Sequence, residues 1–345
     1  MEIDKAFDQN VRTDAAFTTI DTHTGGEPTR IIVDAADQFT LAGDTVRSKR
    51  DSFAEDSDWV RDLLIREPRG HDDMFGAVVV EPEDDCADIA AFFMDSKGYL
   101  DMCGHGTIGV VSALIELGEL SSASTVCVET PAGLVKTHPE YDDNGGVERV
   151  VVQNVDSFVY NSFEVPVSFL KTPLSVDVVY AGNFFVLVDS EQLSRPLETT
   201  YTDEFIEWGL EIRQAVNNEC DIVDPRTGEH AAVAITEIYE HASDVDRSVV
   251  VFGDGQIDRS PCGTGTCAKM ALLYEEGKLS VDQAYPYESI IGTRFEGKIV
   301  DSTDRNGTIV VTPTVAGSAY ITGKHTFIKD SRDPLQSLRI SGTEE

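Results

Sequence analysis

Two short segments decide how this chain is organised: residues 102–107 read MCGHGT, and residues 261–266 read PCGTGT. In each, a cysteine precedes Gly-x-Gly-Thr, and the pattern of an amphipathic helix follows. A cysteine just before a helix lies near the positive end of the helix dipole, which favours its thiolate form. The first N–H groups of the same helix are free to bind an anion such as a carboxylate. Two such units could place one thiol on each side of one carboxylate substrate, as racemisation without a cofactor requires.

The spacing of the two segments indicates a duplicated domain. Cys103 and Cys262 are about 160 positions apart, which is the size of an ordinary domain. Each cysteine is preceded by a strand pattern and followed by a helix pattern of similar length, at residues 106–117 and 264–276, which ends at a glycine. We expect the boundary between the copies near Asp156.

Short segments rich in valine, isoleucine and phenylalanine dominate the rest of the chain and predict strands. They are residues 30–33, 77–80, 89–94, 147–152, 176–188, 248–252, 308–312 and 318–322. Two further helices are expected at residues 56–66 and 203–217. The pattern predicts an α+β protein that is rich in short strands and has few helices.

Length and charge limit the class of protein. A chain of 345 residues suits two domains. The net charge of −35 argues against nucleic acid or an anionic membrane as a partner. The acidic residues are dispersed, which is typical of proteins from a cytoplasm at high salt, and we take a halophilic source as a hypothesis. The N-terminal segment has no apolar signal core and no segment is long enough to span a bilayer, so we expect a cytoplasmic protein.

The other cysteines are expected to be reduced and structural. Burial in the core is the ordinary expectation for Cys86, Cys127 and Cys220, and Cys127 lies in an alternating strand pattern. Cys267 falls inside the second predicted helix and is expected in the core.

Three other interpretations of the paired segments stay open. Residues 104–109 match G-x-G-x-x-G and residues 263–268 match G-x-G-x-x-A, as in dinucleotide-binding folds, but few helices surround them and no nucleotide requires the cysteines. Zinc would need further ligands at suitable spacing, and we predict no metal site. Tight glycine turns with buried cysteines would suffice for either segment alone. The repetition favours a functional interpretation.

These residues resemble the proline racemase family, and the resemblance covers nearly the whole chain. The segments that carry it are residues 21–28 (DTHTGGEP), 69–76 (RGHDDMFG), 102–107, 182–185 (GNFF) and 258–266 (DRSPCGTGT). The two cysteine segments are the most specific of them.

The resemblance implies a diaminopimelate epimerase-like fold. In that fold, two pseudo-symmetric domains each wrap a curved, mostly antiparallel sheet around a central helix, and the active site lies in the cleft between them. The first domain would then comprise residues 1–155 and 321–345 and carry Cys103. The second would comprise residues 156–320 and carry Cys262. A homodimer is also implied.

The resemblance also implies the roles of individual residues. Cys103 and Cys262 would be the two acid–base catalysts, in either order, with no cofactor and no metal. The backbones of Gly104, His105, Gly263 and Thr264 would bind the substrate carboxylate. Asp258 and His105 would hold its nitrogen. The residues alone would instead predict a turn residue at Asp258 and a solvent-exposed residue at the helix start at His105. His23 is treated as structural.

The substrate implied is proline or a hydroxyproline. Phe75, Phe252 and, less firmly, Ile235 match the ring-facing positions and are apolar, which favours proline, because a buried unpaired hydroxyl costs roughly 1–3 kcal/mol. Both phenylalanines could equally be core residues. The alternatives, in order, are 4-hydroxyproline 2-epimerisation, dehydration of trans-3-hydroxyproline, and amino-acid binding without turnover. Dehydratases of this family often lack one of the cysteines, and both are present here.

Overall fold

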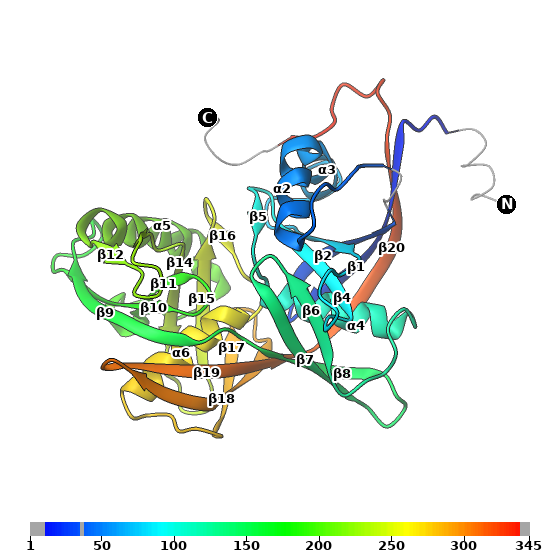
Figure 1. The fold of residues 1–345 in the computed structure, drawn as a ribbon. Helices are drawn as coiled ribbons and strands as arrows, with labels where there is room; N and C mark the ends of the chain where they lie inside the picture. Colours follow the sequence, from blue (N-terminus) through cyan, green and yellow to red (C-terminus); the bar gives the residue numbers. More distant parts are fainter. Residues whose placement is uncertain (1–10, 35–37, 339–345) are drawn as a thin grey trace.

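The structure, a computed structural model, describes residues 11–34 and 38–338, and it forms two β-rich lobes (Figure 1). The elements of the first half are β1 (Ala15–Thr24), β2 (Glu27–Asp34), α2 (Val46–Asp56), α3 (Asp58–Ile65), β3 (Phe75–Val80), β4 (Ile89–Met94), β5 (Tyr99–Leu100), α4 (Gly104–Glu116), β6 (Val126–Thr130), β7 (Gly133–Tyr141) and β8 (Val147–Gln153). Those that follow are β9 (Ser157–Val165), β10 (Leu174–Tyr180), β11 (Phe184–Asp189), η1 (Ser190–Gln192), η2 (Thr199–Tyr201), α5 (Thr202–Glu219), β12 (Ile222–Val223), β13 (His230–Ala231), β14 (Ile235–Glu240), β15 (Asp246–Phe252), β16 (Gln256–Ile257), α6 (Gly263–Glu275), β17 (Ala284–Ser289), β18 (Arg294–Arg305), β19 (Thr308–Gly317) and β20 (Ala319–Lys329).

The two halves repeat one order of strand pairings. In the first half β2 runs parallel to β3, β3 antiparallel to β4, and β4 parallel to β6. In the second half β11 runs parallel to β14, β14 antiparallel to β15, and β15 parallel to β17. The helix that follows a cysteine occupies the same place in both, since α4 precedes β6 and α6 precedes β17. The backbone therefore carries the duplication that the sequence indicates.

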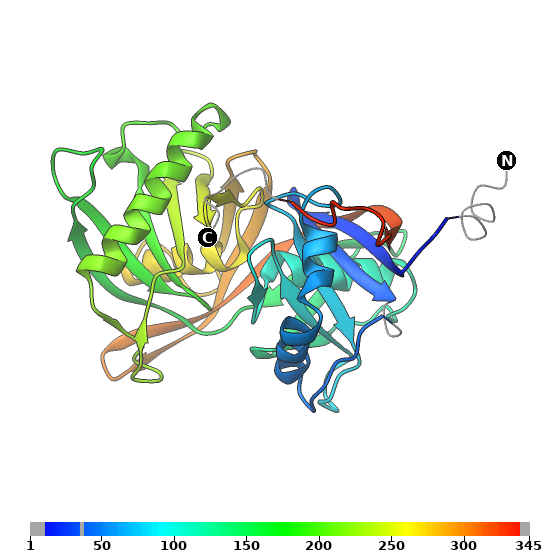
Figure 2. The same ribbon diagram turned by 90° about the horizontal axis from the view of Figure 1, so that it is seen from above.

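Long strands tie the halves together. β19 pairs with β8 over one stretch and with β9 over another. β20 then runs back along the whole of β1 in the first half, from Ala319 opposite Thr24 to Lys329 opposite Ala15. Seen from above, the two lobes lie side by side, and the orange β18–β19 ribbon runs from the second lobe toward the first (Figure 2).

The two helices that follow the cysteines are buried on nearly all sides, so the expected amphipathic pattern is wrong for them. Every residue of α4 from Gly104 to Ile115 is buried, and in α6 all but Thr264 are buried up to Leu273. Both helices contribute to one apolar core that spans the two halves. A helix that is apolar all round has no face for water, which explains why its sequence stripe is weak.

Three other details differ from the sequence expectations. Residues 176–188 form two antiparallel strands, β10 and β11, because the chain turns at Gly182 with a φ of +99°. The helix expected at 56–66 is α3, which starts at Asp58. It is preceded by α2, a helix that the sequence did not predict because only Val46 and Phe53 in it are buried.

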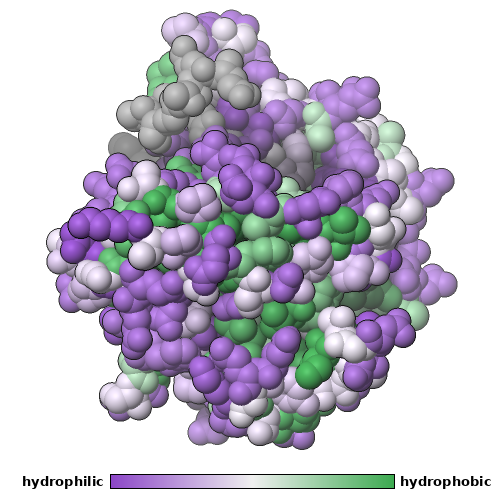
Figure 3. Space-filling view, turned by 90° about the vertical axis from the view of Figure 1, so that its left-hand side faces the viewer, coloured by the Kyte–Doolittle hydropathy of each residue, from purple (hydrophilic) through white to green (hydrophobic). Residues whose placement is uncertain are grey.

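The outer face of the second lobe is mostly hydrophilic, with apolar patches between (Figure 3). Of the helices in the described part of the chain, none combines the length and the apolar character needed to cross a bilayer.

Candidate active site

Cys103 occupies the N-cap position of α4. Its backbone is extended, with φ −142° and ψ 115°, and its Sγ accepts a hydrogen bond from the Gly106 N–H at 3.4 Å. The Thr107 hydroxyl donates to the Cys103 carbonyl oxygen at 2.7 Å. The sulfur atom therefore lies at the positive end of a helix, among N–H groups that favour negative charge.

Cys262 occupies the same position on α6, and the Gly265 N–H donates to its Sγ at 3.4 Å. The Thr266 hydroxyl donates to the Cys262 carbonyl oxygen at 2.8 Å, as Thr107 does in the first copy. Its backbone differs, because φ is +61°, a left-handed conformation that is strained for a residue with a side chain. Such strain collects at functional sites.

The starts of the two helices meet. A Cβ added to Gly104 would lie 3.5 Å from the Cα of Gly263, and a Cβ added to Gly263 would lie 3.5 Å from the Cα of Gly104. The structure therefore brings together the two sequence motifs, which are far apart along the chain. The N–H groups of both first turns, including those of His105 and Thr264, lie at this junction.

His105 is buried, so the expectation of a solvated helix-start residue is wrong. Its ring stands edge-on to Phe75, with centroids 4.5 Å apart. Its Nδ1 lies 3.5 Å from the Cys103 Sγ, and its carbonyl oxygen accepts a hydrogen bond from Thr24 at 2.9 Å. Burial lowers the pKa of His105 to about 3, so the imidazole is neutral around pH 7.

Asp258 is also buried, and it lies directly after β16 in the loop that leads to Cys262 and α6. Its Oδ1 accepts the Ser260 N–H at 2.8 Å, and the Ser260 hydroxyl accepts the Cys262 N–H at 3.1 Å. Burial raises the pKa of Asp258 to about 6, against the hydrogen bonds from Ser260. The aspartate is therefore linked to Cys262 through one residue, and it is ionised above pH 6.

Sequence reasoning missed Glu27, a second carboxyl at this junction. It is fully buried on β2, and its Oε2 accepts the Arg259 N–H at 2.7 Å, which joins the two halves next to Asp258. Burial, and then the Asp258 charge, raise the pKa of Glu27 well above its usual range. Glu27 lies inside the quoted N-terminal segment, but only the fold shows which residue it faces.

Phe75 and Phe252 come from different halves and meet, with ring centroids 5.5 Å apart. Phe75 is buried, and Phe252 packs on the same core as a half-buried side chain. Ile235 also packs there. The wall beside His105 is therefore apolar.

Burial is the largest influence on both thiols and raises the pKa of Cys103 and of Cys262 above the usual value for a thiol. The hydrogen bonds from Gly106 and Gly265 act in the opposite direction. Nearby carboxylates, Asp258 first, raise both pKa values further. Ionisation of either thiol thus depends on which carboxyls around it are charged.

The remaining cysteines differ in burial. Cys267 is fully buried, as predicted, whereas Cys127 on β6 and Cys220 after α5 are only partly buried, so the expectation of full burial is wrong for both. Cys86 is exposed, so the expectation that it is buried is wrong; its N–H donates to the Asp84 side chain in a turn between strands. Within residues 11–34 and 38–338, no group of three or more histidine, cysteine or acidic side chains has the geometry of a metal site.

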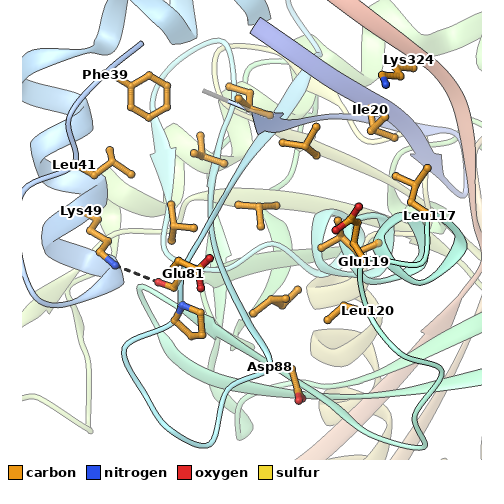
Figure 4. A pocket seen from close by; sticks show the side chains of 18 residues that line it. Ile20, Phe39, Leu41, Lys49, Glu81, Asp88, Leu117, Glu119, Leu120 and Lys324 are labelled. Carbon is orange, nitrogen blue, oxygen red and sulfur yellow. Dashed lines mark hydrogen bonds between the residues drawn. The ribbon is translucent and has the colours of Figure 1, made fainter. Parts of the chain in front are cut away.

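A cavity of about 900 Å³ lies away from this junction, in the first lobe. Its walls are mostly apolar and come from β1, β2, β3 and the end of α4, with Lys49, Asp88 and Lys324 at its edges (Figure 4). Neither Cys103 nor Cys262 lines it.

The proline racemase family matches residues 19–337, and its members named below are racemases and epimerases, which are isomerases. The chain belongs to the proline racemase family. A proline racemase from Acetoanaerobium sticklandii is 39% identical over 92% of this chain and 96% of its own length. A 4-hydroxyproline epimerase from Brucella suis is 37% identical over 93% of this chain and 97% of its own length.

Solved structures of other proteins share the fold of this chain. A hydroxyproline epimerase from Agrobacterium vitis, with bound trans-4-hydroxy-L-proline, superposes with a TM-score of 0.83 at 27% identity, covering 95% of this chain and 96% of that one. A phenazine biosynthesis protein of the PhzF family from Bacillus anthracis, 16% identical with a TM-score of 0.58, shares the fold.

Proposed function

We propose that this enzyme racemises proline, L to D and back, by a two-base mechanism in which Cys103 and Cys262 act as thiolate and thiol. The observation that carries the proposal is the meeting of α4 and α6, each of which begins after a cysteine. Gly104 and Gly263 face each other there so closely that a Cβ added to either would lie 3.5 Å from the Cα of the other. A small substrate held at this junction has one thiol available to each face of its α-carbon.

In the chemical step one thiolate takes the α-proton, so an S–H bond forms as the C–H bond breaks. The other thiol gives its proton to the opposite face of the same carbon, and the product leaves with inverted configuration. Positioned acid–base groups of this kind contribute about 10²–10⁴-fold each. The charge that develops on the carboxylate is stabilised by the N–H groups of Gly104, His105, Gly263 and Thr264.

The substrate nitrogen is assigned to Asp258 and His105. Asp258 is ionised above its pKa of about 6 and attracts a cationic amine. His105 is neutral at pH 7 because burial lowers its pKa to about 3, so it can accept a hydrogen bond without adding a positive charge. The reaction needs no cofactor in this scheme, because the thiols supply both proton transfers.

The ring of the substrate is assigned to Phe75 and Phe252. Their apolar surface favours proline, since a ring hydroxyl without a partner costs roughly 1–3 kcal/mol. Epimerisation of 4-hydroxyproline is the second candidate, because a relative of that name is 37% identical over nearly the whole chain.

We also infer the larger assembly. The first domain comprises residues 1–155 and 321–345, of which 1–10, 35–37 and 339–345 lie outside the described residues. The second comprises residues 156–320, in a diaminopimelate epimerase-like arrangement with a central helix, α4 or α6, in each. The pairing of β20 with β1 supports the return of the C-terminal segment. We propose a cytoplasmic homodimer, and sedimentation of the purified protein tests its mass.

The function is tested by incubating the protein separately with L-proline and trans-4-hydroxy-L-proline in D₂O at high salt. Proton NMR follows loss of the α-hydrogen, and chiral chromatography follows the isomers. Exchange and D-proline formation with proline support the proposal. A preference for hydroxyproline would select the epimerase. Absence of exchange with both substrates would refute both activities and leave dehydration of trans-3-hydroxyproline, and then amino-acid binding without turnover, as the alternatives.

A further inference from the structure

The two thiols differ in what lies beneath them. Under the first turn of α6, a Cβ added to Gly265 would collide with the Glu237 Oε2 while lying 3.2 Å from the Cys262 Sγ. Under the first turn of α4, a Cβ added to Gly106 would lie 2.8 Å from the Phe93 ring and 3.1 Å from the Cys103 Sγ. The Glu237 carboxyl group therefore lies on the helix side of the Cys262 sulfur, and the Phe93 ring lies on the helix side of the Cys103 sulfur.

Glu237 is held in place by its own contacts. It lies on β14, is fully buried, and accepts a hydrogen bond on Oε1 from the Tyr287 hydroxyl at 2.6 Å. Its Oε2, the oxygen that faces Gly265, is buried without a hydrogen-bond partner among the described residues. Such an oxygen is not needed for the packing of the sheet, because an apolar side chain would fill the space without a desolvated polar atom.

Buried groups from several elements surround Glu237. The Lys269 side chain of α6 is fully buried, with its Nζ 3.1 Å from the centroid of the Tyr239 ring. The titratable and charged groups that face the Glu237 carboxyl are Tyr285 and Tyr287 on β17, Cys262, Cys267 and Lys269 by α6, Tyr239 on β14 itself, and Asp258. Lys269 and Tyr287 favour its charged form; burial and Asp258 oppose it.

We propose that Glu237 is a positioning residue that makes the two thiols unequal, so that Cys262 keeps its proton in the substrate-free enzyme and Cys103 is the thiol that ionises. The inference rests on the proposed two-thiol reaction. A negative charge beside Cys262 disfavours a second one on its sulfur, whereas Phe93 places no charge beside Cys103.

The other carboxyls do not cancel this difference. Asp258 acts on both thiols, and Asp95 raises the pKa of Cys103 alone, by less than Asp258 or Glu27 does. Glu27 acts on Cys103, but burial and the Asp258 charge raise the pKa of Glu27 well above its usual range, which disfavours its charged form. Burial raises the pKa of Glu237 to about 7, so its charge is substantial at neutral pH and above.

The proposal has a kinetic consequence. One isomer of the substrate reacts with the form that has a Cys103 thiolate, and the other with the form that has a Cys262 thiolate. The apparent affinity for each isomer falls with the population of the form it needs. Because the equilibrium constant of a racemisation is one, kcat/KM must stay equal in both directions. Glu237 therefore affects the ratio of the two KM values and, equally, the ratio of the two kcat values.

The test is alkylation of substrate-free enzyme with iodoacetamide, which reacts with thiolates, read by peptide mass spectrometry at each cysteine. The comparison is fair, because Cys103 and Cys262 are 6% and 7% exposed. In the wild type we expect Cys103 to react first. E237Q should increase the reactivity of Cys262 relative to Cys103 on the order of tenfold, equivalent to one pKa unit. The ratio of the KM values for L- and D-proline should change by a similar factor.

Y285F is the matched control, because it removes a buried hydroxyl from β17 that donates to Asp246 and not to Glu237. It should leave the alkylation ratio unchanged. If E237Q does not fold, Y287F takes its place, because it removes the hydroxyl that donates to Glu237 Oε1. Loss of this donor disfavours the charged form of Glu237, so labelling of Cys262 relative to Cys103 should again increase. An unchanged ratio in the folded variant, or faster labelling of Cys262 in the wild type, overturns the proposal.

The two proposals fail in different ways. If wild-type enzyme exchanges the α-hydrogen of proline but E237Q leaves both ratios unchanged, the role of Glu237 is refuted and the proposed function stands. If no exchange occurs, the function is refuted, while the alkylation ratio still reports whether Glu237 separates the two thiols.

Discussion

Two glycines at the starts of the helices are expected to respond in opposite ways to an added methyl group. In Gly104→Ala the new Cβ has one neighbour within 4 Å, the Gly263 Cα at 3.5 Å, which is an ordinary contact. In Gly265→Ala the new Cβ collides with the Glu237 Oε2 and lies 3.1 Å from the Cys262 Cβ. Neither glycine has a positive φ, so the backbone accepts alanine at both positions.

The expected free energies of unfolding follow from these distances. G104A should raise the free energy of unfolding by up to about 1 kcal/mol, because alanine restricts the unfolded chain and suits a helix. G265A should lower it by roughly 1–3 kcal/mol, because both neighbours that it meets are fixed in a packed interior. Urea denaturation at one salt concentration measures the two variants side by side.

Activity should fall for G104A in spite of its stability. The methyl group enters the gap between Gly104 and Gly263, where the substrate carboxylate is proposed to bind. A displacement of about 1 Å lowers the rate on the order of 10²-fold. The assay is the kcat/KM of racemisation, followed by polarimetry. If G104A keeps kcat/KM within threefold of the wild type, or is as destabilised as G265A, the assignment of this gap to the carboxylate is wrong.

Four further outcomes are expected. C103S and C262S should each lower kcat/KM by about 10²–10⁴-fold with unchanged thermal unfolding, and a kcat/KM within tenfold of the wild type in either would contradict the two-base scheme. E237Q should remove a decline of about 3 kcal/mol in unfolding free energy between pH 4.5 and 7, because a carboxyl whose pKa is raised to about 7 destabilises the fold as pH rises through that window; parallel urea curves for both proteins would argue against it. R30M should lower stability by about 3–5 kcal/mol in the same urea assay, since it removes the buried guanidinium that lies 2.7 Å from the Asp21 carboxylate and leaves that carboxylate with Thr19 and His325 alone; a loss under 1 kcal/mol would contradict this. The unfolding midpoint should rise with KCl because of the net charge of −35, and full stability in dilute buffer would refute the halophilic hypothesis.

Local sequence was sufficient for the helix starts. The pattern of cysteine, Gly-x-Gly-Thr and an apolar run predicts helices at residues 106–117 and 264–276, and the structure has α4 at Gly104–Glu116 and α6 at Gly263–Glu275. The N-cap position of each cysteine follows from the same pattern, because capping depends on residues within one turn. The repeated pairing order of the two halves agrees with the repeated motif.

Features that depend on distant residues were not predictable in this way. Glu27 faces the Arg259 backbone across more than two hundred residues, and Glu237 lies under Gly265 from another strand. Both look like ordinary strand residues with charged side chains, for which solvent exposure is the usual expectation. Helix α2 escaped detection for the opposite reason, since it buries too few apolar residues to leave a periodic signal.

The departures from symmetry are the informative part of this duplicated fold. Both halves place a cysteine at the N-cap position of a helix, but its φ is −142° at Cys103 and +61° at Cys262. The residue after the first glycine is a buried histidine at 105 and a threonine at 264, and the group beneath the sulfur is Phe93 or Glu237. A proline molecule has no two-fold axis, because its nitrogen and ring lie on one side of the α-carbon. A site that binds both mirror forms therefore needs two equivalent proton-transfer groups in unequal surroundings. In the proposed scheme His105 and Phe75 provide the side for the nitrogen and ring, and the proposed role of Glu237 is to set which thiol holds the proton in the substrate-free enzyme.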